Sequence, residues 1–233
     1  MENNRTSSVL VIWIVVLILL LLFAFAYGVA AAEPTMAFNN DFTVLAPEGT
    51  EDILKAATQY KKEIANEWGV APGNGPTTIS YSPSASDTAF TWARSGKRKY
   101  HTVYLQTNLH RAKGSTLKHE IAHVVLAWRV PIWINEGIAC SYDDKERKDI
   151  RSRIANESPM RVWEIFKLDE VKSGVEYANS ESLSNYLISL GGKKRLASFG
   201  VEAKEMGHTA ALASWYGVTA KELEERWRLW QKH

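Results

Sequence analysis

The segments HEIAH at 119–123 and PIWINEGIA at 131–139 determine how this chain is interpreted. The first lies within a helical pattern that runs from Ser115 to Arg129. The proline that opens the second segment ends this pattern, because the residue before a proline disfavours helix. Residues four apart on a helix lie one turn above each other, so His119 and His123 can present two imidazole nitrogens to one Zn²⁺. The spacing therefore predicts a pair of metal ligands on one helix face.

Two glutamates complete the predicted site. Glu120 projects about 100° around the helix axis from His119, where it is poorly placed as a ligand but can take a proton from a water at the open coordination position. Glu136 follows His123 by 13 residues, enough for the chain to reverse and return a carboxylate to the metal. Three protein ligands with an open position define a catalytic zinc site, whereas a structural site is closed by a fourth side chain. We expect Gly137 to allow the two helices to approach closely.

HEIAH followed by the downstream NEG closely resembles the gluzincin zinc metallopeptidases, in particular the peptidase MA-like family. The resemblance implies that His119, His123 and Glu136 bind zinc, that Glu120 is the general base, and that the substrate is a peptide or protein. It also implies an α+β, zincin-like fold: a small twisted sheet with helices, an active-site helix and a C-terminal helical subdomain. Looser matches at Tyr177–Leu183 and before Trp227 extend the resemblance.

Three alternative interpretations of these residues predict different sequence or binding properties. An extended metzincin motif needs Gly at Leu126 and His at Arg129, so the third ligand does not come from there. A catalytically inactive zincin-like domain that binds a partner at the cell envelope would keep the same four residues. HEIAH in an ordinary amphipathic helix would bind no zinc.

Further side chains near the motif have candidate roles. Tyr177 or Tyr142 can donate a hydrogen bond to the oxyanion that develops at an attacked carbonyl. Cys140 lies one turn beyond Glu136, and packing is the favoured interpretation for a small buried cysteine. We expect His101 to be a half-exposed strand residue.

The composition is that of a globular protein, with 45% apolar and 23% charged residues and a net charge of +2. The charges alternate in sign, as in DDKERKD at 143–149, which is typical of a solvated face. A nucleic-acid binder usually shows a basic stripe, so no nucleic-acid partner is expected. One cysteine excludes an intramolecular disulfide.

Residues 1–32 are predicted to be a signal anchor or a signal peptide. Val9–Tyr27 is an apolar run of 19 residues, which as a helix spans roughly the 30 Å of a bilayer core. Its length favours a transmembrane anchor with an extracytoplasmic catalytic domain. The small residues Ala30–Ala32 fit a cleavage site, which would make the protein secreted.

Residues 33–233 are expected to form one domain with its sheet at about 42–113, its active-site helices at about 115–147 and its helical part at about 160–233. The residue pattern predicts a helix at Glu51–Trp68 with Thr50 as its N-cap and Gly69 as its end. Strands are expected at Phe42–Ala46, Thr77–Tyr81, Ala89–Ala93 and Tyr100–Gln106.

Overall fold

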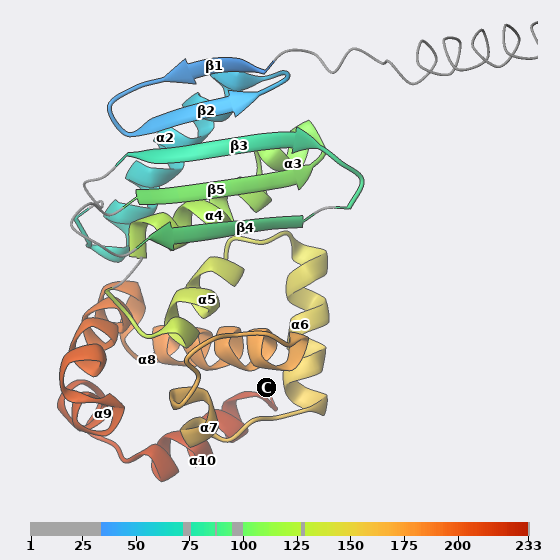
Figure 1. The fold of residues 1–233 in the computed structure, drawn as a ribbon. Coiled ribbons are helices and arrows are strands. Elements are labelled where there is room, and N and C mark those ends of the chain that lie inside the picture. The colour runs from blue at the N-terminus through green and yellow to red at the C-terminus, as the bar shows by residue number, and fades with distance from the viewer. Residues whose placement is uncertain (1–33, 72–75, 87, 95–99, 127–128, 233) are drawn as a thin grey trace, which may run out of the picture.

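The computed structural model describes residues 34–71, 76–86, 88–94, 100–126 and 129–232. These residues form an α+β fold, as expected, with a sheet and its helices at one end and a mainly helical part at the other (Figure 1). The predicted segment at 1–32 lies outside them. The elements in chain order are β1 Thr35–Phe38, β2 Phe42–Ala46, α2 Thr50–Trp68, β3 Thr77–Pro83, β4 Thr88–Arg94, β5 Tyr100–Thr107, α3 Leu109–Ala112, α4 Ser115–Leu126, α5 Ile132–Cys140, α6 Lys145–Glu157, α7 Val162–Phe166, α8 Gly174–Met206, α9 His208–Tyr216 and α10 Ala220–Trp230.

The described strands form one mixed sheet in the order β1-β2-β3-β5-β4. The strands β2, β3 and β5 are parallel, and the two outer strands β1 and β4 run antiparallel to their neighbours. All four expected strands are present, whereas β1 was not predicted because its four residues are too few to show a period of two. The edge strand β4 borders the helical part (Figure 1), and its Phe90 pairs with Tyr104 of β5.

The helix α2 confirms the expected segment and corrects its start. Gly69 ends the helix in the left-handed conformation, as predicted, but the N-cap is Gly49 at φ 66° and not Thr50. A glycine adopts this conformation without steric cost, so the helix begins one residue earlier. The Thr50 hydroxyl lies 3.0 Å from that of Thr35 and links the helix to β1.

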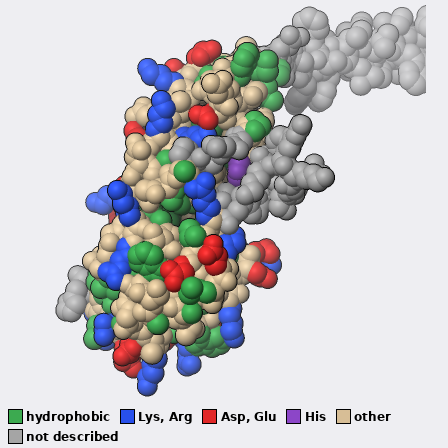
Figure 2. Space-filling model, turned by 90° about the vertical axis from the view of Figure 1, so that its left-hand side faces the viewer, with side chains coloured by type: hydrophobic (Ala, Val, Ile, Leu, Met, Phe, Trp, Pro, Cys, Tyr) green, Lys and Arg blue, Asp and Glu red, His purple; other side chains and the backbone are tan. Residues whose placement is uncertain are grey.

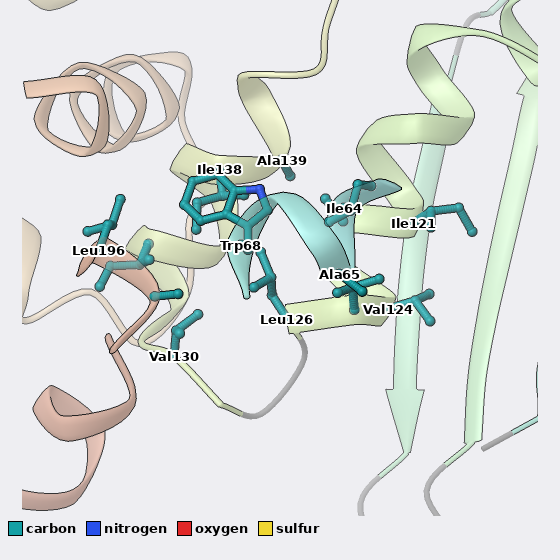
Figure 3. Close-up of a cluster of buried hydrophobic side chains, with 14 of the residues drawn as sticks. Ile64, Ala65, Trp68, Ile121, Val124, Leu126, Val130, Ile138, Ala139 and Leu196 are labelled. Atoms are coloured by element: carbon teal, nitrogen blue, oxygen red, sulfur yellow. The ribbon is translucent and has the colours of Figure 1, made fainter. Parts of the chain in front are cut away.

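One buried apolar cluster joins the sheet to the helical part (Figure 3). Trp68 of α2 is fully buried within it, together with Leu126 at the end of α4 and Ile138 of α5. Leu196 of α8 extends the cluster into the helical part. Because α4 and α5 share this core, the two segments that carry the predicted ligands are held against each other by packing.

The helical part is built around α8, which contacts α5, α6 and α9. The backbone of α8 is interrupted at Gly192, where φ is 79°. Of the helices in the described ranges, none combines the length and apolar character needed to cross a membrane. Basic and acidic side chains are interspersed over the face drawn in Figure 2.

Candidate metal centre

Three of the predicted residues converge at the junction of α4 and α5. The Nε2 atoms of His119 and His123 lie 3.2 Å apart, and the Nε2 of His123 lies 3.6 Å from a carboxylate oxygen of Glu136. One ligand atom from each residue lies within 4.8 Å of the others. A tetrahedral ion with ligands at about 2.0–2.1 Å separates two ligands by about 3.4 Å. The spacing therefore fits a single ion between the three side chains.

Hydrogen bonds at the far side of each ring orient the imidazoles. The Nδ1 of His119 lies 3.1 Å from the Oδ1 of Asp143, and the Nδ1 of His123 contacts the Oδ1 of Asn135. Both partner oxygens are acceptors, so each Nδ1 carries the proton and donates it. Each Nε2 then has a free lone pair directed toward the common point, which is the tautomer that metal binding requires.

The charge around His119 favours a positive group at this point. Burial by itself lowers the pKa of the His119 imidazole, but the hydrogen bond to Asp143 and the charges of Glu120 and Glu136 outweigh it and raise that pKa. Three electron-rich atoms repel one another unless a cation lies between them. The arrangement is therefore electrostatically complementary to a metal ion.

A buried ion network supports Asp143. One of its carboxylate oxygens lies 2.9 Å from the guanidinium of Arg151, which in turn lies 2.5 Å from the carboxylate of Glu181 on α8. Burial raises the pKa of Asp143, but its partners His119 and Arg151 lower it overall. Asp143 is only 5% exposed. The expectation that 143–149 is wholly a solvated face is therefore wrong at its first residue, because the network draws Asp143 inward.

Glu136 is positioned by the contact of α5 with α8. A β-carbon at Gly137 would lie 2.2 Å from the hydroxyl of Ser184 and 2.5 Å from the backbone oxygen of Ser180. The glycine therefore permits α5 to approach α8 closely. The sequence had suggested instead a close approach to the helix of His119. The two serine residues are themselves buried.

Glu120 is hydrogen-bonded to β4. Its carboxylate accepts a hydrogen bond of 2.6 Å from the hydroxyl of Thr91, which also lies 3.3 Å from the backbone oxygen of Glu120. Only 3% of Glu120 is exposed. The edge strand thus holds this carboxylate beside the three converging side chains.

The two candidate tyrosines are in different environments. Tyr177 lies in the first turn of α8 and lines the cavity at the metal centre. Burial and the charge of Glu136 raise its pKa, so its hydroxyl remains protonated and able to donate. Tyr142 contacts Glu67 and accepts a hydrogen bond of 2.7 Å from the indole of Trp68. Tyr142 is therefore tied to α2 and is not placed to contact an oxyanion.

Two further candidates, Cys140 and His101, are buried, and the sulfur of Cys140 lies within 4.8 Å of a His119 nitrogen. Cys140 is 1% exposed, and burial raises the pKa of its thiol. His101 is 6% exposed and so is buried, not half-exposed as expected, because the inner face of its strand packs against α4. His208 accepts a hydrogen bond of 3.0 Å from Trp133.

A cavity of about 550 Å³ opens at the metal centre. We call it the first hollow. One wall is β4, with Phe90 and Thr91, and the other is formed by the start of α5 together with Leu168 and Tyr177. Its volume lies within the range of about 300–1,000 Å³ typical of ligand sites.

Sequence reasoning missed three residues that hold the centre: Thr91, Asn135 and Asp143. Asn135 directly precedes Glu136 in the NEG segment, which is the one sequence signal for its role. Comparison of the chain with family models and with curated proteins finds no match. The functional assignment therefore rests on the motif residues and their geometry.

Proposed function

We propose that this protein is a zinc-dependent metallopeptidase with a zincin-like fold. In this proposal His119, His123 and Glu136 bind Zn²⁺, and Glu120 is the general base. The observation that carries it is the convergence of two imidazole Nε2 atoms and one carboxylate at a cavity, with a second carboxylate held just outside the ligand set.

The donor set fits zinc. Imidazole nitrogen and carboxylate oxygen are both zinc ligands, and three protein ligands leave a position for solvent. The hydrogen bonds from the rings to Asp143 and Asn135 provide the outer support that such sites normally have. Cys140 forms a second group of possible ligand atoms with His119 and Asp143, also within 4.8 Å of one another, but Asp143 is already the hydrogen-bond partner of the His119 Nδ1.

When bound, zinc lowers the pKa of a coordinated water toward about 7 and polarises the substrate carbonyl. Glu120 accepts one proton from the attacking water, whose oxygen bonds to the carbonyl carbon. The carbon–nitrogen bond then breaks, and Glu120 transfers the proton to the leaving amine. Thr91 fixes one oxygen of Glu120, and the protonated hydroxyl of Tyr177 is the candidate donor to the developing oxyanion.

The edge strand that forms one wall of the cavity favours a peptide substrate. The strand β4 is the edge of the described sheet, and an extended peptide can add to such an edge through main-chain hydrogen bonds. Phe90 and Thr91 of this strand line the first hollow. A peptide paired with β4 would thus lie across the metal centre.

The proposed location follows from the sequence of the N-terminal segment. Val9–Tyr27 would anchor the protein in the membrane with its catalytic domain outside the cytoplasm, or the protein would be secreted after cleavage near Ala32.

The test combines metal analysis with peptide cleavage. We expect the purified full chain to contain about one zinc per molecule and to cleave members of a peptide library, with activity lost to a chelator and restored by zinc. Glu120→Gln should retain zinc and lose hydrolysis, whereas His123→Ala should lose both. Glu51→Gln, at an exposed position of α2, is the matched control and should behave as the wild type.

Full activity of Glu120→Gln with zinc bound would refute the general-base role. Zinc in the wild type without cleavage of any peptide would favour the inactive binding domain instead.

A further inference from the structure

A second hollow adjoins the metal centre on the side opposite the first. It has a volume of about 490 Å³ and is bounded by β4, α4, α6 and the start of α8. The two hollows have four residues in common: Ala89, His119, Glu120 and Tyr177. The metal ligand, the general base and the candidate oxyanion donor therefore lie where the hollows meet.

The order of residues along two elements shows that the hollows are in line. On β4 the second hollow is lined by Thr88 and the first by Phe90 and Thr91. On α4 the second hollow is lined by Thr116 and the first by His123. Along both elements, the direction from the N-terminal to the C-terminal end leads from the second hollow to the first. The cleft continues along the edge strand on both sides of the metal centre.

We infer that the protein is an endopeptidase, which cleaves within an extended polypeptide and leaves several residues bound on each side of the scissile bond. This inference rests on the proposed peptidase function. The scissile carbonyl would lie at the four shared residues, and the chain would continue into each hollow. An enzyme that removes terminal residues needs one side to be short and to end in a group that pairs with the ionised terminus.

Both hollows are lined by apolar and charged side chains. The first has Leu168 and the start of α5 together with Asp169 and Lys204, and the second has Ile150 and Ile154 together with the buried Asp143 and the guanidinium groups of Arg147 and Arg151. Asp143 and Arg151 are 2.9 Å apart, and Arg147 lies 3.8 Å from Asp143. The two arginines are thus paired with a carboxylate of the protein itself and are not left to bind an ionised substrate terminus.

The experiment compares peptides of one sequence with free termini and with an acetylated N-terminus and amidated C-terminus. The full chain loaded with zinc should cleave both forms internally at rates within about twofold of each other, with products identified by mass spectrometry. Release of single residues from a free end, with the blocked peptide intact, would overturn the inference but leave the peptidase function standing. Absence of any chelator-sensitive cleavage would overturn both.

Two variants test the placement of the hollows. Leu168→Glu lies in the first hollow and Ile150→Glu in the second, where Ile150 is 41% exposed. Across a peptide library, each variant should reduce cleavage of peptides that carry an acidic residue near the scissile bond by about tenfold. The acidic residue should matter on one side of that bond for Leu168→Glu and on the other side for Ile150→Glu. If both variants act on the same side, the inference fails. Melting temperatures control for misfolding.

Discussion

The hydroxyl of Thr91 donates a hydrogen bond of 2.6 Å to the carboxylate of Glu120 and so joins the edge strand of the sheet to the helix that carries both imidazoles. This bond occupies one carboxylate oxygen and leaves the other for proton transfer. The strand expected to bind the substrate also positions the proposed base.

Thr91→Val should therefore lower kcat about tenfold with little change in KM, because a misplaced general base loses part of a contribution of about 10²–10⁴. Steady-state kinetics with one peptide gives both constants. Thr91→Ser, which keeps the hydroxyl, should restore most of kcat. An unchanged kcat in Thr91→Val would show that the hydrogen bond does not position the base.

Removal of the Asp143 carboxylate should weaken zinc binding. Asp143→Ala leaves the Nδ1 of His119 without its acceptor and Arg151 with Glu181 as its remaining buried partner, and outer partners such as Asp143 contribute about 10–100-fold to metal affinity. Competition with a fluorescent chelator measures the affinity. Asp149→Ala, at an exposed position of α6, is the control. Equal zinc affinity in both variants would contradict the role of Asp143.

Gly137→Ala should destabilise the fold by about 1–3 kcal/mol, since the new methyl group collides with Ser180 and Ser184 of α8. For a domain of this size, the melting temperature should fall by about 2–4 °C per kcal/mol. Gly174→Ala, where a β-carbon would have no neighbour within 4 Å, is the matched control. A melting temperature equal to that of the control would show that α5 and α8 can separate without cost.

Glu67 should make stability depend on pH. Burial raises its pKa, but Lys193 and Tyr142 contact the carboxylate and lower the pKa overall. A lowered native pKa stabilises the fold above the unfolded value of about 4.3, and the effect is lost as the pH falls through the native pKa.

Glu67→Gln should therefore cost about 1 kcal/mol at pH 7, a value reduced by the partial exposure of the carboxylate. In urea unfolding, the difference from wild type should shrink as the pH falls below about 4. Glu225→Gln, on the exposed face of α10, should show no such trend. A difference that stays constant down to pH 3 would exclude the ionic origin.

The convergence of the two histidines was predictable because its information is local. Two histidines four residues apart face the same way on any helix, and α4 supplies that helix. The return of Glu136 was predictable from the break at Pro131, which is the N-cap of α5, and from the NEG segment.

The supporting residues were not predictable, because their roles depend on contacts between distant segments. Asp143 opens a run of alternating charges, and only its pairing with Arg151 and the histidine ring buries it. Nothing in the sequence distinguishes Thr91 from other strand threonines. Its role follows only from the contact of β4 with α4. Tyr142 and Tyr177 were both candidates in the sequence, and the packing of α2 and α8 distinguishes them.

The close fit of Gly137 against Ser180 and Ser184 means that α8 determines the position of Glu136, the proposed third ligand. Bulkier residues at 180 or 184 would push α5 outward and carry the Glu136 carboxylate away from the imidazoles. If Glu136 binds zinc as proposed, substitutions at 180 and 184 would therefore weaken the binding from positions that do not contact the ion.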